Sequence, residues 1–188
     1  LGLDDDLVVS ACARVDGDVW VANYNAPGQI VIAGSPIAVG DASDKAKELG
    51  AKRAMGLPVG GAFHTPFMAP ARDRLRKALA EVEVRAPAIP VVANVDAVAR
   101  EDAPEWPQLL ASQLCSPVQW RQSLYTLQEL GCSTFVELGP GTVLTGMAKR
   151  TLKEVNTLSV ATPEDVDTLL ATVTDLGSST QGSIGAGE

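Results

Sequence analysis

The only histidine of the chain, His64, lies in the stretch VGGAFHTPFMAP, between a Gly-Gly pair and two prolines. An imidazole titrates near neutral pH, so it can accept a proton from a nucleophile and later return it. This stretch is predicted to be a loop between a strand and a helix, where active-site residues often gather. The alternative is a loop histidine that bonds only to neighbouring backbone groups. Residue type and spacing alone leave both interpretations open.

A general base for acyl transfer needs a nucleophile, and the common arrangement is a serine in a G-x-S-x-G turn. No such turn occurs in the chain. Ser35 precedes Pro36 and is predicted to cap a helix instead. Cys115 could act as a thiol nucleophile, but a buried and inert cysteine is the favoured interpretation. The chain therefore offers a candidate base without a matched nucleophile.

The segment VELGPGTVLTGMAKR, residues 136–150, is predicted to be a strand, a turn and a helix. A helix N-terminus can hold an anion, but the GK[ST] ending of a phosphate-binding loop is absent, so a structural turn is favoured. Basic side chains stand out against the acidic background and are interpreted mainly as solvated helix faces. Some of them could instead contact phosphates or an acidic partner; they are Lys52, Arg53, Arg72, Arg74, Arg76, Lys77, Lys149 and Arg150.

Composition limits the possible classes of protein. The 188 residues are 46% hydrophobic, enough for one domain with a small subdomain, and no apolar run approaches the ~18 residues of a membrane span. A net charge of −8 argues against nucleic-acid binding. Three widely spaced cysteines form neither a disulfide framework nor a zinc cluster, and this indicates a reducing, cytoplasmic location. The N-terminus lacks the features of a signal peptide and enters a helical pattern almost at once, as a chain cut inside a fold would.

Two patterns of elements follow one another along the chain. The first alternates as helix, strand, strand, helix and strand over residues 4–14, 18–25, 29–34, 35–50 and 51–59. This is the order of a ferredoxin-like unit without its first strand, of which residues 1–3 would be the stub.

The second pattern predicts strands over residues 88–95, 132–138 and 156–161, and helices over 68–82, 104–114, 117–131, 142–152 and 163–173. Such alternation indicates an α/β layer with a largely parallel sheet. The predicted domains are a small subdomain at 1–58, a larger core at 59–175 and a flexible Gly/Ser-rich tail at 176–188.

Five segments, residues 21–34, 51–71, 89–97, 113–120 and 136–150, together resemble the C-terminal half of the malonyl-CoA:acyl carrier protein transacylases, the acyltransferase family of fatty acid and polyketide synthases. The similarity runs from about residue 2 to about residue 170, in the order of the family. It implies an α/β fold: the C-terminal part of an α/β-hydrolase-like acyltransferase core, plus a ferredoxin-like small subdomain lacking its first strand.

The resemblance implies transfer of malonyl from coenzyme A to a serine, and from the serine to the phosphopantetheine thiol of acyl carrier protein. His64 matches the catalytic base of the family. Gln113 matches the residue whose main-chain carbonyl holds that histidine in its working tautomer, in place of the carboxylate of a triad. Malonyl-CoA is then a substrate, and no bound cofactor or metal is expected.

The substrate-contacting residues implied by the resemblance are Phe63, Asn25, Gln29 and Arg53. A ring at Phe63 would crowd an α-methyl group and favour malonyl over methylmalonyl, although it could equally be a packing residue. Asn25 and Gln29, with Asn23, border the active-site gorge in the family or bond the hairpin internally. Arg53 could face the phosphates of coenzyme A.

One departure from the family is large, because the GHSxGE-type serine turn of the N-terminal half is not in these residues. The implied partners are acyl carrier protein, malonyl-CoA and a complementary N-terminal half that carries the nucleophile, with neither nucleic acid nor membrane. The isolated chain is expected to be unstable or to associate with such a half. The alternatives are a non-catalytic remnant that binds carrier protein or a synthase subunit, and a transferase that uses Cys115.

Overall fold

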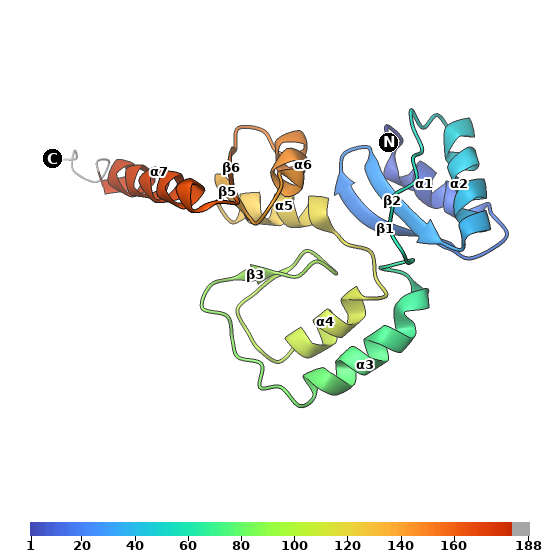
Figure 1. Cartoon of the computed structure of the whole chain (residues 1–188), viewed down its shortest axis with the longest axis horizontal. Helices are drawn as coiled ribbons and strands as arrows, with labels where there is room; N and C mark the ends of the chain where they lie inside the picture. The colour runs from blue at the N-terminus through green and yellow to red at the C-terminus, as the bar shows by residue number, and fades with distance from the viewer. Residues whose placement is uncertain (182–188) are drawn as a thin grey trace. The chain divides into compact units, whose positions relative to one another are not determined.

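The computed structural model describes residues 1–181 and divides the chain into two compact units, one of residues 1–131 and one that begins at Cys132. Figure 1 shows the elements of both units. The mixture of helices and strands confirms the predicted α/β class. The predicted subdomain boundary between residues 58 and 59 stays a prediction.

The first unit contains a hairpin of β1 (Val19–Ala26) and β2 (Gln29–Gly34), which pair antiparallel. Gly28 makes the turn with a φ of +66°, a conformation that favours glycine. Helices α1 (Asp5–Ala13) and α2 (Pro36–Glu48) pack against this hairpin (Figure 1). These four elements match the predicted helix, strand, strand and helix.

Small side chains bring the two helices close to the hairpin. One buried cluster joins Val8 and Ala11 of α1 to Val21, and the other joins Val19 to Ala38 and Ala42 of α2. Alanine loses little side-chain entropy in a helix and lets neighbouring backbones approach closely. The hairpin therefore has one covered face, which fixes its register.

The strand predicted over residues 51–59 is absent, and this prediction was wrong. Only its first residues pair, because Lys52 N–H donates to the Leu1 carbonyl at 2.9 Å and the N-terminal amine donates to the Arg53 carbonyl at 2.8 Å. On its other side the N-terminus bonds to the hairpin, where Gly2 N–H donates to the Gly28 carbonyl at 2.6 Å. A strand exists only beside a partner, and residues 54–58 have no ladder partner among the described residues.

The remainder of the first unit holds the histidine loop, one 3-10 turn and three α-helices. They are η1 (Pro66–Met68), α3 (Ala69–Leu79), α4 (Trp106–Gln113) and α5 (Trp120–Glu129). Helices α3 and α4 pack on each other. The helices predicted over 68–82, 104–114 and 117–131 are therefore confirmed, with somewhat shorter bounds.

The buried strand predicted over residues 88–95 shrinks to a two-residue strand, β3 (Val91–Val92). It pairs antiparallel with the equally short β4 (Ala99–Arg100) rather than joining a parallel sheet. The Arg100 guanidinium donates to both oxygens of Asp96, at 3.0 and 2.6 Å, and closes the turn between the strands. Apolar runs can form a long buried strand only where neighbouring strands lie on both sides.

The outer edge of β1 pairs with the chain that follows α4. Val118 N–H donates to the Ala22 carbonyl and Tyr24 N–H donates to the Val118 carbonyl, each at 2.9 Å. The Arg121 guanidinium, at the start of α5, forms an ion pair with Asp5 of α1. These contacts attach the end of α4 to the hairpin and so place Gln113.

The second unit is a strand–helix–strand unit followed by a helix. β5 (Thr134–Leu138) and β6 (Asn156–Val160) pair in parallel, joined by α6 (Val143–Thr151). The predicted parallel pairing is thus confirmed for these two strands alone among residues 1–181. α7 (Pro163–Gln181) continues into the segment predicted as a flexible tail, and residues 182–188 of that prediction lie outside the described residues.

Candidate active site

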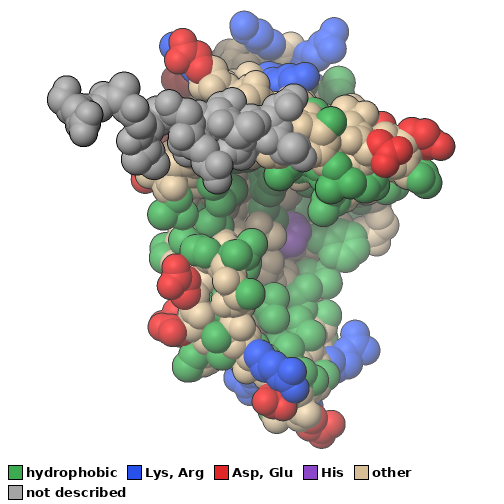
Figure 2. Space-filling view, turned by 90° about the vertical axis from the view of Figure 1, so that its left-hand side faces the viewer, with side chains coloured by type: hydrophobic (Ala, Val, Ile, Leu, Met, Phe, Trp, Pro, Cys, Tyr) green, Lys and Arg blue, Asp and Glu red, His purple; other side chains and the backbone are tan. Residues whose placement is uncertain are grey.

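The backbone at His64 is in a conformation that residues other than glycine rarely adopt, with a φ of +61°. The loop around it is held by neighbouring groups. Thr65 is fully buried, and its hydroxyl donates to the Ala62 carbonyl at 2.6 Å. Left-handed backbone of this kind persists only where surrounding contacts over-determine it, and it is frequent at functional sites. The imidazole itself is partly exposed, with hydrophobic side chains gathered around it (Figure 2).

The imidazole contacts the end of α4. The Nδ1 atom of His64 lies 3.0 Å from the main-chain carbonyl oxygen of Gln113, across 49 residues of sequence. Gln113 is the last residue of α4, and the last carbonyls of a helix have no partner inside it. That carbonyl otherwise accepts a long bond of 3.4 Å from Ser116 N–H. The oxygen is therefore available to accept a hydrogen bond from Nδ1–H, and this tautomer would leave Nε2 unprotonated and able to act as a base.

The side chain of the same residue also reaches the imidazole. The Nε2 atom of Gln113 lies 3.4 Å from His64 Nδ1 and donates to the Ser116 carbonyl at 3.0 Å. The Oε1 atom of this amide is buried without a hydrogen-bond partner among the described residues. Because an amide N–H needs an unprotonated Nδ1, whereas the carbonyl needs a protonated one, the two groups of Gln113 favour opposite tautomers of His64.

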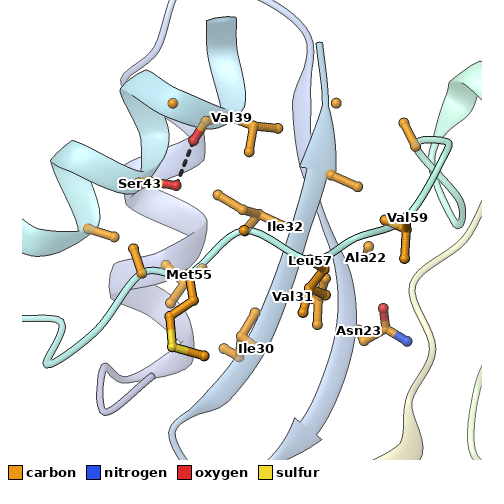
Figure 3. A pocket seen from close by; sticks show the side chains of 18 of the residues that line it. Ala22, Asn23, Ile30, Val31, Ile32, Val39, Ser43, Met55, Leu57 and Val59 are labelled. Carbon is orange, nitrogen blue, oxygen red and sulfur yellow. Dashed lines mark hydrogen bonds between the residues drawn. The ribbon is translucent and has the colours of Figure 1, made fainter. Parts of the chain in front are cut away.

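A wide trough of about 1530 Å³ opens beside the imidazole. Figure 3 shows its apolar lining: Ile30, Val31 and Ile32 come from β2, and Met55 and Leu57 come from the segment that leads to the histidine. A mostly apolar lining with a few polar groups is typical of sites that bind small organic ligands.

The structure brings the predicted site residues together. Gln113 meets the trough through its contact with the imidazole, and five others line the trough directly: His64, Phe63, Asn25, Gln29 and Arg53. Phe63 has 49% of its surface exposed, so its ring is not a core residue. Within the described residues, Arg53 forms no ion pair. Their catalytic and binding roles remain predictions.

One contact in this region was not found from the sequence. The ring of Trp20, on β1, meets the ring of Phe67 edge to face, with centroids 5.3 Å apart and planes at 87°. Phe67 belongs to η1, three residues after the histidine, and also lines the trough. No linear pattern connects two aromatic residues 47 positions apart, so the sequence carried no signal for it.

Neither alternative nucleophile lies in a catalytic arrangement with the histidine. Ser35 occupies the predicted N-cap position of α2, although its hydroxyl makes no capping bond. Cys115 is partly exposed rather than buried, and it lies in a separate cleft of about 270 Å³ with Arg72 and Arg76. The thiol is therefore in a different cavity from His64.

The N-terminus of α6 is already occupied by a carboxylate of the chain. Glu137 accepts bonds from the N–H groups of Leu144 and Thr145 at 3.1 and 2.8 Å, and from the Thr145 hydroxyl at 2.9 Å. The Thr145 N–H is the main reason why the pKa of Glu137 is lowered. This favours the structural-turn interpretation of residues 136–150, because the helix N-terminus has its anion.

Across residues 1–181, no three His, Cys, Asp or Glu side chains lie close enough together to hold a metal ion. In the same part of the chain, no helix combines the length and apolar character needed to cross a bilayer.

The histidine contacts the C-terminal carbonyl of a helix and lies beside a trough on a mixed α/β scaffold. This arrangement defines a candidate acyl-transfer site. The acyl transferase domain family matches residues 3–172, and the chain belongs to this family.

The chain is similar to the malonyl CoA-acyl carrier protein transacylase of Bacillus subtilis, with 37% identity over 176 residues, which are 92% of this chain and 56% of that protein. Among solved structures it resembles the acyl carrier protein S-malonyltransferase of Vibrio cholerae, with 43% identity, a TM-score of 0.86 and coverage of 90% and 56%. It also resembles a malonyl-transacylase solved in complex with a type II PKS acyl-carrier protein, with 38% identity, a TM-score of 0.88 and coverage of 92% and 56%. The chain thus spans a little more than half the length of these relatives, which fits the predicted resemblance to their C-terminal portion.

Proposed function

We propose that this chain supplies the acid–base half of a site that transfers malonyl from coenzyme A to the phosphopantetheine thiol of acyl carrier protein. The observation that carries the proposal is the 3.0 Å contact between His64 Nδ1 and the Gln113 carbonyl, at the edge of the trough. The relatives named malonyl-transacylases, one of them solved with an acyl-carrier protein, support the substrate and the partner.

The proposed chemistry has two matching halves. With Nδ1–H donating a hydrogen bond to the Gln113 carbonyl, the imidazole takes the proton of a serine hydroxyl at Nε2 as the serine attacks the malonyl thioester. The imidazolium then protonates the thiolate of coenzyme A as it leaves. In the second half the imidazole deprotonates the carrier thiol, which attacks the acyl-serine, and the imidazolium returns that proton to the serine oxygen as it leaves. The serine belongs to a complementary N-terminal half outside these 188 residues.

The lining residues have proposed roles around this base. Phe63 excludes an α-methyl group, Asn25 and Gln29 border the substrate, and Arg53 meets the phosphates of coenzyme A. A complementary half that covers the apolar wall would also bury Met55 and Leu57, of which more than half is exposed here. We place the reaction in the cytoplasm, with no resident cofactor.

The test combines the chain with a complementary half, labelled malonyl-CoA and carrier protein. His64→Ala is expected to lower transfer by roughly 10²- to 10⁴-fold, the usual contribution of a general base. The control is Ser35→Ala, which alters a hydroxyl at the same trough and should leave transfer unchanged. Transfer that survives His64→Ala would remove the histidine from the mechanism.

A second candidate is a non-catalytic remnant that binds carrier protein or a synthase subunit. It is favoured by one observation: among the described residues, no serine or cysteine forms a hydrogen bond with the imidazole. Binding of carrier protein by the chain, with no transfer even beside a complementary half, would support this candidate over the first. Carrier binding that is insensitive to salt would count against a charged docking surface.

A further inference from the structure

Two aromatic rings, Trp20 and Phe67, meet beside the 3-10 turn that follows the histidine. Trp20 lies on β1 between Val19 and Val21, which are both buried on the opposite face of the strand. Its ring meets Phe67 edge to face at 5.3 Å, a favourable geometry for two aromatic rings. The contact joins the hairpin, whose register is fixed by its core, to the 3-10 turn that follows His64.

The histidine loop depends on contacts of this kind. Its backbone at His64 is left-handed, and the segment before it, residues 54–61, makes a single backbone bond among the described residues, from Val59 N–H to the Leu57 carbonyl. Support must therefore come from the residues that follow the histidine. Thr65 is buried there, Met68 N–H donates to the Thr65 carbonyl at 3.0 Å, and Phe67 is held by Trp20.

A small displacement of this loop would have a chemical consequence. The Nδ1 atom of His64 lies 3.0 Å from the Gln113 carbonyl and 3.4 Å from the Gln113 amide nitrogen. The first contact keeps the proton on Nδ1 and frees Nε2 as a base. The second contact would place the proton on Nε2, where the imidazole can no longer accept one. A shift of a few tenths of an ångström thus decides between a competent and an incompetent tautomer.

We propose that Trp20 is a positioning residue for His64. Through Phe67 it holds the loop so that Nδ1 donates a hydrogen bond to the Gln113 carbonyl and does not accept one from the Gln113 amide. This inference rests on the proposed function, since the tautomer matters only if His64 acts as the base. Trp20 does not itself line the trough, and it reaches the histidine loop through the ring of Phe67.

The single histidine makes the test direct. In ¹⁵N-labelled chain, long-range ¹H–¹⁵N correlations report which nitrogen carries the proton, at a pH where the imidazole is neutral. Trp20→Leu and Phe67→Leu are each expected to raise the ratio of the Nε2–H to the Nδ1–H form about fivefold, the effect of losing one ordinary hydrogen bond. The double variant should change the ratio no more than the larger single change, because both remove the same contact.

Two controls separate positioning from simple destabilisation. Trp20→Phe keeps an aromatic edge and should restore the wild-type ratio. Val19→Ala weakens the same strand from its buried face without touching Phe67, and should leave the tautomer unchanged. A wild-type ratio in both Leu variants, or an equal shift in Val19→Ala, would overturn the proposal. Failure of the proposed function would give a different result. Transfer would then survive His64→Ala, while the tautomer of His64 would still respond to Trp20→Leu.

Discussion

The two groups of Gln113 that contact His64 require opposite placements of one proton, and only the carbonyl contact is productive. A backbone carbonyl cannot be removed by substitution of its own side chain. A substitution of Gln113 therefore removes the side-chain amide but keeps the main-chain carbonyl, so the contributions of the two groups can be measured separately.

Gln113→Ala keeps the carbonyl and removes the competing amide. We expect transfer with a complementary half to fall by no more than a few-fold, with the loss coming from the 3.0 Å bond between the amide and the Ser116 carbonyl. Rates of malonyl transfer as a function of pH provide the measurement. A loss as large as that of His64→Ala would show that the side chain, not the carbonyl, orients the imidazole.

Phe63→Ala tests the substrate preference at the same scale. The half-exposed ring lines the trough beside His64, so its removal would open space for an α-methyl group. One methyl group in an apolar pocket changes discrimination between substrates by about 10- to 200-fold. The ratio of malonyl to methylmalonyl transfer should therefore decrease by a factor of about 10 to 200 in Phe63→Ala. Ile37→Ala, which changes an exposed apolar side chain outside the trough, serves as the comparison. An unchanged ratio for Phe63→Ala would leave the ring as a packing residue.

At the scale of single elements, the N-terminus of α6 couples a carboxylate to the parallel strand pair. Glu137 lies on β5 and accepts from two backbone N–H groups in the first turn of α6. These bonds favour the ionised form, so the pKa of Glu137 is lowered from 4.5, chiefly by Thr145 N–H. The stabilisation is therefore present above pH 4.5 and is lost as the pH falls through the lower, folded-state pKa.

Glu137→Gln should lower the midpoint of thermal unfolding at pH 7, and this difference from the wild type should shrink at about pH 3, where the wild-type carboxyl is also neutral. Circular dichroism at both pH values provides the measurement. Glu154→Gln, an exposed carboxylate of the same unit, is the matched control and should change neither midpoint. A difference that is equal at both pH values would mean that the charge of Glu137 does not hold the helix.

At the scale of the whole molecule, the main feature is the extent of apolar surface beside the candidate site. Leu57, Met55 and Val59 of the segment along the trough are all more than half exposed. Contiguous apolar surface of this kind marks an interaction site or a liability to aggregate. We expect the chain by itself to bind an apolar dye strongly, and a complementary half to suppress that binding.

Leu57→Asp should weaken association with a complementary half roughly tenfold or more, since burial of a leucine side chain contributes about 1.5–3 kcal/mol. Titration calorimetry measures the affinity. Ile37→Asp is the matched control, because Ile37 is 78% exposed but does not line the trough. Equal weakening by both variants would show that the trough is not the surface that the other half covers.

Local signals in the sequence predicted much of the fold. The Val- and Ile-rich runs around the glycine turn produce the hairpin, and the Ser-Pro start and Gly50 bound α2, because turn and helix-end preferences act over a few residues. His64 stood out as the sole candidate base, and the family resemblance alone suggested its pairing with Gln113.

Tertiary structure decided the rest, because those features depend on groups far apart in the chain. Residues 54–58 were predicted to continue a strand, but they have no ladder partner among the described residues and form no strand. The carbonyl of Gln113 reaches the imidazole only because Val118 pairs with β1 and fixes the end of α4. Residue types alone made His64 a possible base; the distances of 3.0 and 3.4 Å to one glutamine determine which of its nitrogens is free to act.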